Sequence, residues 1–221
     1  MTAVEHGGRL YGLGRTVWHD EASRQFPAAT APLRTVQHQL RAPVLDQGQL
    51  GSCTGNAISQ ALNTDPLIPV GRRVLTEDDA VAIYSWATHH DPYPGAYPPE
   101  DTGSSGLAVA KAVKHLKLIS SYHHAFGLQH TLEALVLQPV IIGIPWKSTM
   151  FDVGADGYLD ISGSTVGGHE VCLTGLDVKF KTVTLLNSWG PGWGASGHAF
   201  LRWADLGALL SQDGDVTVPV L

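Results

Sequence analysis

Gln47-Gly48-Gln49-Leu50-Gly51-Ser52-Cys53-Thr54-Gly55-Asn56 is the stretch of this sequence that decides the fold. It places a cysteine directly after a glycine-rich turn, at the start of a predicted helix. Apolar residues recur at helical spacing before the chain reaches Pro66, namely Ala57, Ile58, Ala61 and Leu62. The positive end of a helix dipole favours a thiolate over a thiol, and the side-chain amide of Gln47 is a candidate donor to an oxyanion. Cys53 is therefore a candidate nucleophile.

Two later stretches supply the base that such a nucleophile needs. Gly167-Gly168-His169-Glu170-Val171-Cys172 places a histidine at the head of an apolar run, and Asn187-Ser188-Trp189-Gly190 follows a second run. Two such runs joined by a short polar turn predict antiparallel strands, which bring His169 beside Asn187. Asn187 then orients one ring nitrogen while the other faces Cys53. Trp189 is suited to cover that hydrogen bond.

These stretches together resemble the papain-like (family C1) cysteine peptidases, and the sequence around Cys53 is similar to the bacterial and phage branch. The chain departs from the family signature at two positions. Leu50 stands where the signature has a cysteine, and Thr54 stands where it has an aromatic residue. Without a partner at position 50, the family's disulfide beside the nucleophile is not expected here, and Cys172 is expected to be a core residue.

The resemblance implies an α+β fold of two lobes. The helical lobe, about residues 45–122, holds the nucleophile helix, and an antiparallel β-barrel lobe covers about residues 127–221. Together they form a peptidase domain over residues 34–221. Residues 1–33 form an N-terminal extension, which is short for the inhibitory propeptides of the family. Two interpretations of this extension stay open: an arm packed on the domain, or a short autoinhibitory segment.

The activity that the resemblance implies is hydrolysis of peptide bonds by a cysteine endopeptidase. Cys53 attacks a peptide carbonyl, its backbone N–H and the Gln47 amide bind the oxyanion, and His169 protonates the leaving amine before it activates water. Asn187 holds the imidazole in orientation. Alternatives stay open: a cell-wall peptide hydrolase or an acyl transferase of phage or bacterial origin, or a non-catalytic papain-like domain used for binding or assembly.

Candidate substrate-binding residues lie on both sides of the expected cleft. In the family, a glycine-containing segment pairs with the substrate backbone, and the matching stretch here precedes a helical run that begins near Leu107. The candidates are Gly103, Ser104, Ser105 and Gly106, together with Gly168 and Trp189 beside the catalytic residues. Residues 103–106 are equally suited to cap the helix that follows. Glu170 would favour basic substrate side chains if it pointed into the cleft.

Composition restricts the remaining function classes. The chain has 221 residues, is 43% apolar and carries a formal charge of −6, which fits a folded domain and disfavours general affinity for nucleic acid. No apolar run is long enough to span a bilayer, so no membrane partner is expected. The first residues lack the basic and apolar regions of a secretory signal. We expect a cytoplasmic location, or the virion or host cytoplasm if the protein is phage-encoded.

Cofactors and metals are not expected. His89-His90-Asp91 is the most metal-like group, but adjacent residues on a helix do not share a face. Residues 103–107 do not make a phosphate-binding loop, because Leu107 stands where that pattern has lysine. The partner we expect is a peptide or protein substrate, and the sequence leaves the oligomeric state open.

Overall fold

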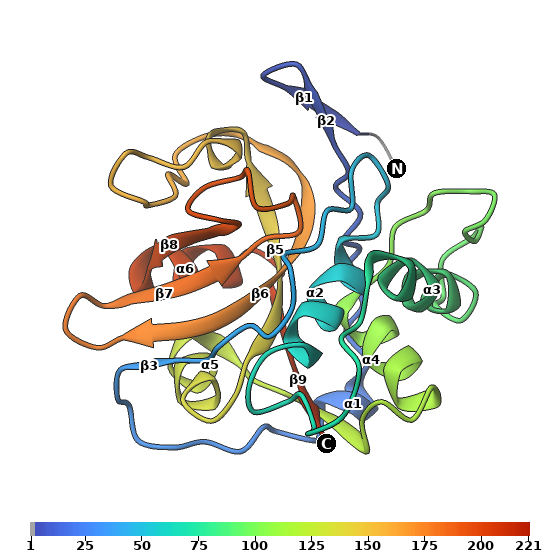
Figure 1. Ribbon diagram of the computed structural model, residues 1–221, viewed down its shortest axis with the longest axis horizontal. Helices are drawn as coiled ribbons and strands as arrows, with labels where there is room; N and C mark the ends of the chain where they lie inside the picture. Colours follow the sequence, from blue (N-terminus) through green and yellow to red (C-terminus); the bar gives the residue numbers. More distant parts are fainter. Residues whose placement is uncertain (1–2) are drawn as a thin grey trace.

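The computed structural model describes residues 3–221, and these form two lobes (Figure 1). One lobe is built from the helices α2 (Cys53–Leu62), α3 (Glu77–Thr88) and α4 (Gly106–His115). The other contains an antiparallel sheet flanked by α5 (Gly127–Leu135) and α6 (Trp203–Leu210). Helix α2 packs against α3 and α4 on one side and against the sheet strand β6 on the other. The predicted two-lobed α+β fold is therefore confirmed.

The sheet runs through the order β4–β9–β5–β6–β7–β8, and β3 pairs with β6 beside this path. Every pair in it is antiparallel. Its strands are β3 (Val36–Gln37), β4 (Ser121–His124), β5 (Val140–Lys147), β6 (Thr165–Asp177), β7 (Thr182–Leu186), β8 (His198–Arg202) and β9 (Asp215–Val220). A 3-10 turn, η1 (Ser148–Phe151), follows β5. Strand β9 pairs with both β4 and β5, so the end of the chain links the strand beside the helical lobe to the centre of the sheet.

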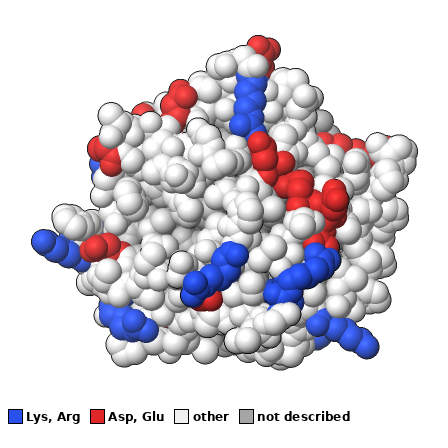
Figure 2. Space-filling model, viewed as in Figure 1, with Lys and Arg blue, Asp and Glu red and all other residues white. Residues whose placement is uncertain are grey.

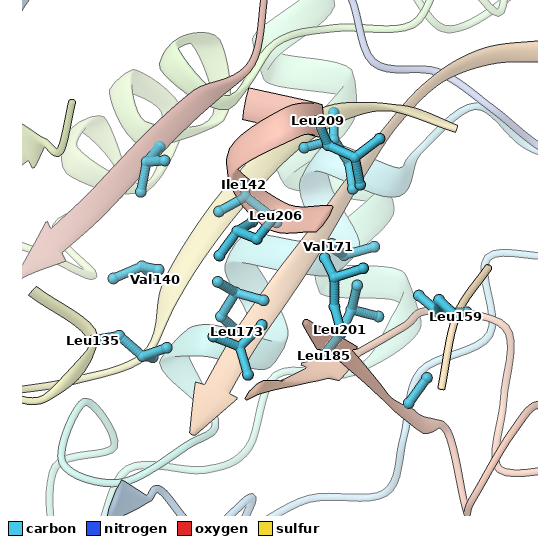
Figure 3. Packing of buried hydrophobic residues seen from close by; sticks show 14 of the residues in the cluster. Leu135, Val140, Ile142, Leu159, Val171, Leu173, Leu185, Leu201, Leu206 and Leu209 are labelled. Carbon is cyan, nitrogen blue, oxygen red and sulfur yellow. The ribbon is translucent and has the colours of Figure 1, made fainter. Parts of the chain in front are cut away.

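Both faces of the central strands are covered, which explains why β5 is buried along its whole length. Ile141 and its register partner Cys172 face the core shared with α2, whereas the next residue, Ile142, faces the core under α6. Figure 3 shows Ile142 and Leu173 pointing toward Leu206 of α6. Each fully buried aliphatic side chain contributes about 1.5–3 kcal/mol. The sequence prediction that Cys172 is a small core residue agrees with its complete burial.

Helix α2 is the central element, and all of its residues are buried. Its close approach to α3 requires glycine at position 55, because a Cβ there would lie 2.2 Å from the carbonyl oxygen of Ala80. Helix α3 begins with a capping box between Thr76 and Asp79, as the sequence of its first turn predicts. Within residues 3–221, no helix is both long and apolar enough to cross a membrane.

The N-terminal residues form a hairpin, β1 (Val4–His6) and β2 (Arg9–Tyr11), followed by an extended stretch and the short helix α1 (Glu21–Arg24). In Figure 1 the hairpin projects at one end of the boundary between the lobes, and the chain then passes beside α2 toward α1. This course brings the extended stretch across the residues that the sequence assigns to the active site.

Candidate active site

Cys53 is the first residue of α2, and its side chain is completely buried. Ser52 occupies the N-cap position, but its side chain makes no capping hydrogen bond. The first backbone N–H groups of the helix are therefore not occupied by this side chain. The backbone N–H groups of Glu170, Gly14 and Thr54 lie at the thiol, where each of them favours the thiolate. The sulfur therefore lies against β6 at Glu170, the residue directly after His169.

His169 and Asn187 form the predicted pair. His169 lies in β6 and Asn187 directly follows β7, and the pairing of these strands brings His169 Nε2 to 2.8 Å from Asn187 Oδ1. The Trp189 ring stacks on the imidazole with a centroid distance of 4.9 Å, and Trp146 meets it edge-on at 4.8 Å. His169 Nδ1 has no hydrogen-bond partner within residues 3–221, which leaves this nitrogen available for proton exchange.

Gln47 is buried, and its side-chain amide is held by three hydrogen bonds. Its Nε2 donates to the carbonyl oxygens of Gly12, at 3.0 Å, and Leu50, at 2.8 Å. Its Oε1 accepts a hydrogen bond from the Ser188 hydroxyl at 2.6 Å, which fixes the amide orientation. The amide that the sequence assigns to an oxyanion thus binds a backbone carbonyl of the N-terminal stretch.

Residues 9–16, which we call the covering segment, run through the cleft between the two walls. The Ser104 N–H donates to the Gly14 carbonyl at 2.8 Å, and the Thr16 N–H donates to the Ser104 carbonyl at 2.7 Å. On the opposite wall, the Arg15 N–H donates to the Gly168 carbonyl at 3.1 Å. Ser104 and Gly168, both predicted substrate-binding residues, therefore hydrogen-bond to a piece of the chain itself.

Glycines allow the covering segment to lie flat on the nucleophile loop. A Cβ at Gly12 would lie 2.1 Å from the Leu50 carbonyl oxygen, and one at Gly14 would lie 1.8 Å from that of Gly51. Both distances are far inside van der Waals contact. The spacing of these two glycines is the signal in the sequence that could have indicated a chain segment held tightly against another backbone.

Aromatic contacts hold the hairpin above the cleft. The Tyr11 ring lies 4.4 Å from the Trp189 ring and 5.2 Å from the Phe151 ring, measured between centroids. Arg9 forms an ion pair of 2.5 Å with Asp46, and it donates to the Trp189 carbonyl. The ion pair is largely exposed and contributes little, so the aromatic contacts dominate this end of the covering segment.

The remaining predicted substrate-binding residues shape the loop before α4. Ser105 is the N-cap of α4, where its hydroxyl accepts a hydrogen bond from the Ala108 N–H at 3.2 Å, and Gly106 is the first helical residue. Gly103 has a positive φ of 74° and donates its N–H to the Tyr84 hydroxyl. The helix-capping interpretation of this stretch is therefore confirmed, and substrate binding by it stays a prediction.

Burial shifts the pKa values of Cys53 and His169. Desolvation raises the pKa of the Cys53 thiol to about 12, against the backbone N–H groups that lower it. Desolvation also lowers the pKa of His169 to about 4, although its hydrogen bond to Asn187 opposes the shift. Burial thus disfavours the charged form of both groups in this state, and it opposes the helix dipole on which the expected thiolate rests.

Comparisons with known proteins identify similar sequences and similar structures. No family model matches the chain. It is 27% identical over 193 residues to an uncharacterized peptidase C1-like protein of Acanthamoeba polyphaga mimivirus, covering 70% of this chain and 62% of that protein. It is 28% identical over 180 residues to the gamete and mating-type specific protein A of Dictyostelium discoideum, covering 71% and 39%. The chain thus spans less than two thirds of either relative.

Two solved structures are similar to this chain over nearly its whole length. Xylellain, a cysteine protease from Xylella fastidiosa, superimposes with a TM-score of 0.76 at 16% identity, covering 95% of this chain and 96% of that one. Digestive procathepsin L 3 of Tenebrio molitor gives a TM-score of 0.68 at 18% identity, covering 95% and 76%. The chain has the fold of the papain-like C1 cysteine proteases, and the resemblance expected from the sequence is confirmed.

Proposed function

We propose that this protein is a cysteine peptidase that hydrolyses peptide bonds through a thioacyl intermediate on Cys53. The observation that carries the proposal is the His169–Asn187 hydrogen bond, enclosed by Trp189, beside a cysteine at the start of a buried helix. Similarity to the C1-like viral protein and to solved cysteine proteases supports the same activity. A peptide or protein is the substrate that this site would take.

The arrangement supports each step of acyl transfer. Cys53 transfers its proton to His169 Nδ1 and attacks the substrate carbonyl, while the Gln47 amide and the Cys53 backbone N–H stabilise the oxyanion. Protonated His169 then gives its proton to the leaving amine, and the neutral imidazole activates water for deacylation. Asn187 keeps the ring in place throughout, and Trp189 excludes water from their hydrogen bond.

We further infer that the covering segment holds the enzyme in a latent state, which favours the autoinhibitory interpretation of residues 1–33. The segment uses the amide of Gln47 and the backbone of Ser104 and Gly168, which are the groups that a substrate would need. Substrate and segment therefore exclude one another. The segment also leaves the thiol and imidazole neutral, so that its departure would restore both access and the ion pair.

Intact-mass analysis with an epoxysuccinyl inhibitor tests the proposed function. We expect slow labelling of the wild-type chain at one site, with no labelling of Cys53→Ala and a severe loss in His169→Ala. Cys172 is the matched internal control, because it is equally buried but has no histidine partner. Labelling of Cys53→Ala, or equal rates in the wild type and His169→Ala, would contradict a thiol–imidazole pair.

A further inference from the structure

One peptide group of the nucleophile loop is hydrogen-bonded at both of its polar atoms. It joins Leu50 to Gly51, just before Cys53. Its carbonyl oxygen accepts a hydrogen bond from Gln47 Nε2 at 2.8 Å, and its N–H donates to Asp101 Oδ2 at 2.9 Å. This peptide group therefore connects the proposed oxyanion donor to a carboxylate in the loop before α4.

Gly51 lets the carboxylate lie directly against this peptide group. A Cβ at Gly51 would lie 2.7 Å from Asp101 Oδ1 and 3.3 Å from its Oδ2, so a side chain here would push the carboxylate away. Both cysteines of the chain are free, and no disulfide therefore ties the loop to the rest of the helical lobe. The covering segment also lies on this loop, but it must leave before a substrate enters the cleft. Asp101 then remains as the partner of the Gly51 N–H.

Tyr84 fixes the other oxygen of the same carboxylate. Its hydroxyl donates to Asp101 Oδ1 at 2.6 Å and accepts a hydrogen bond from the Gly103 N–H at 2.9 Å. Tyr84 lies in α3 and is completely buried. Burial, together with the hydrogen bond to Asp101, raises the pKa of this phenol well above its ordinary value. The hydroxyl therefore keeps its proton and directs it to Asp101, so that each oxygen of the carboxylate has a defined donor.

The peptide group in turn keeps the Gln47 amide in place. Nε2 of Gln47 donates one hydrogen bond to the Leu50 carbonyl and another to the Gly12 carbonyl of the covering segment. When a substrate replaces the segment, the second hydrogen becomes available to the oxyanion, and the first still fixes the direction of the amide. A peptide group whose N–H has lost its partner is free to rotate, and its carbonyl oxygen then turns away from Gln47. Loss of Asp101 would therefore misplace the oxyanion donor, and a misplacement of about 1 Å can cost about 10²-fold in rate.

We propose that Asp101 is a positioning residue, which holds the Gln47 amide where the oxyanion forms and does so through the peptide group between Leu50 and Gly51. This inference rests on the proposed peptidase function and adds to it a residue that acts through Gln47 and not on the substrate. A purely structural role is different, because it would lower the stability of the fold without singling out the step that needs an oxyanion donor.

Turnover and inhibitor labelling separate these two roles. Peptide hydrolysis passes through a tetrahedral oxyanion, whereas the opening of an epoxide ring by Cys53 forms no such intermediate at a carbonyl carbon. The parent enzyme is the full chain with Tyr11→Ala, which removes the ring contacts that hold the covering segment on Trp189 and Phe151. Adding Asp101→Ala is expected to lower kcat at least about tenfold, while Cys53 is labelled by the epoxysuccinyl inhibitor within about twofold of the parent rate.

A double-mutant cycle shows whether Asp101 acts through Gln47. In a chain that already carries Gln47→Ala, Asp101→Ala is expected to lower kcat by no more than about twofold, because the group that it positions is gone. Figure 2 shows acidic side chains gathered below the hairpin on the side of the helical lobe, so the loss of one negative charge needs its own control. Glu100→Ala is the matched control, because it removes an exposed carboxylate one residue away from Asp101 and is expected to leave kcat unchanged.

Asp101→Asn carries the test if Asp101→Ala does not fold. Its single acceptor oxygen faces two donors, the Gly51 N–H and the Tyr84 hydroxyl, so we expect a smaller loss of kcat with the same dependence on Gln47. An unchanged kcat in the folded variants, or an equal loss with and without Gln47, overturns the positioning role while the peptidase function stands. If Cys53 of the parent chain is not labelled and no peptide is cleaved, the proposed function fails, and with it the inference.

Discussion

Gly14→Ala is expected to open the cleft while leaving the side chains of Cys53, His169, Asn187 and Gln47 unchanged. The added Cβ would lie 1.8 Å from the Gly51 carbonyl oxygen, and that oxygen belongs to the backbone of the nucleophile loop. A rigid backbone does not yield by the distance required, so the covering segment is displaced instead. Gly14 does not have a positive φ, and the substitution therefore acts through this overlap alone.

The magnitude follows from the hydrogen bonds that surround Gly14. Its carbonyl accepts from Ser104, while the neighbouring N–H groups of Arg15 and Thr16 donate to Gly168 and Ser104. Each such bond contributes about 1 kcal/mol net, so losing these three shifts the equilibrium toward the open cleft by about 3 kcal/mol. That change corresponds to about a hundredfold increase in the open population.

The assay is the rate of Cys53 labelling by the epoxysuccinyl inhibitor, followed by intact mass. This rate reports the open population when the segment opens and closes faster than the inhibitor reacts. Gly192→Ala is the matched control, because a Cβ there meets nothing within 4 Å and Gly192 does not have a positive φ. If Gly14→Ala were labelled at the wild-type rate with an unchanged melting temperature, the covering segment would not limit access to Cys53.

Two further predictions follow from the site. In the Gly14→Ala background, Gln47→Ala lowers kcat for peptide hydrolysis by about 10²–10³-fold but leaves residual activity, as expected for the loss of one oxyanion donor. An unchanged kcat would show that Gln47 is not an oxyanion donor. The second prediction uses Cys53→Ala, which cannot digest itself. Its free energy of unfolding falls by up to about 3 kcal/mol as the pH decreases from 6.5 to about 4. The cause is that His169 binds a proton in the unfolded chain, whereas burial lowers the pKa of this ring in the folded chain. Urea titrations that show the same pH slope after adding His169→Gln would contradict this.

The lobes were predictable because their signals are local and repeated. The helical spacing after Cys53 predicted α2, and the apolar runs on either side of a polar turn predicted β6 and β7. Pairing of those strands then fixed the place of His169 relative to Asn187, which the 2.8 Å hydrogen bond confirms. Helix α6 was missed because its residues follow β8 without a capping side chain or a break in the sequence.

The course of the N-terminal residues was not predictable in the same way. The contacts of residues 9–16 are almost all with partners far along the chain, and such contacts leave no periodic pattern in a short segment. Their polar and glycine-rich composition is typical of a loop. The structure instead gives several of them specific partners: Tyr11 packs on Trp189, Gly12 and Gly14 lie on the nucleophile loop, and Arg15 pairs with Asp215.

Missing this segment also left burial out of the sequence argument for a thiolate. A helix end contributes about 0.3–1 kcal/mol at an exposed site, and the sequence argument for a thiolate rested on that effect. The structure adds complete burial, which moves the pKa of Cys53 and that of His169 in the directions that disfavour the ion pair. The same segment contacts the Cys53 thiol through the Gly14 N–H and the opposite wall through the Arg15 N–H. The latent state that we propose therefore combines loss of access with loss of charge.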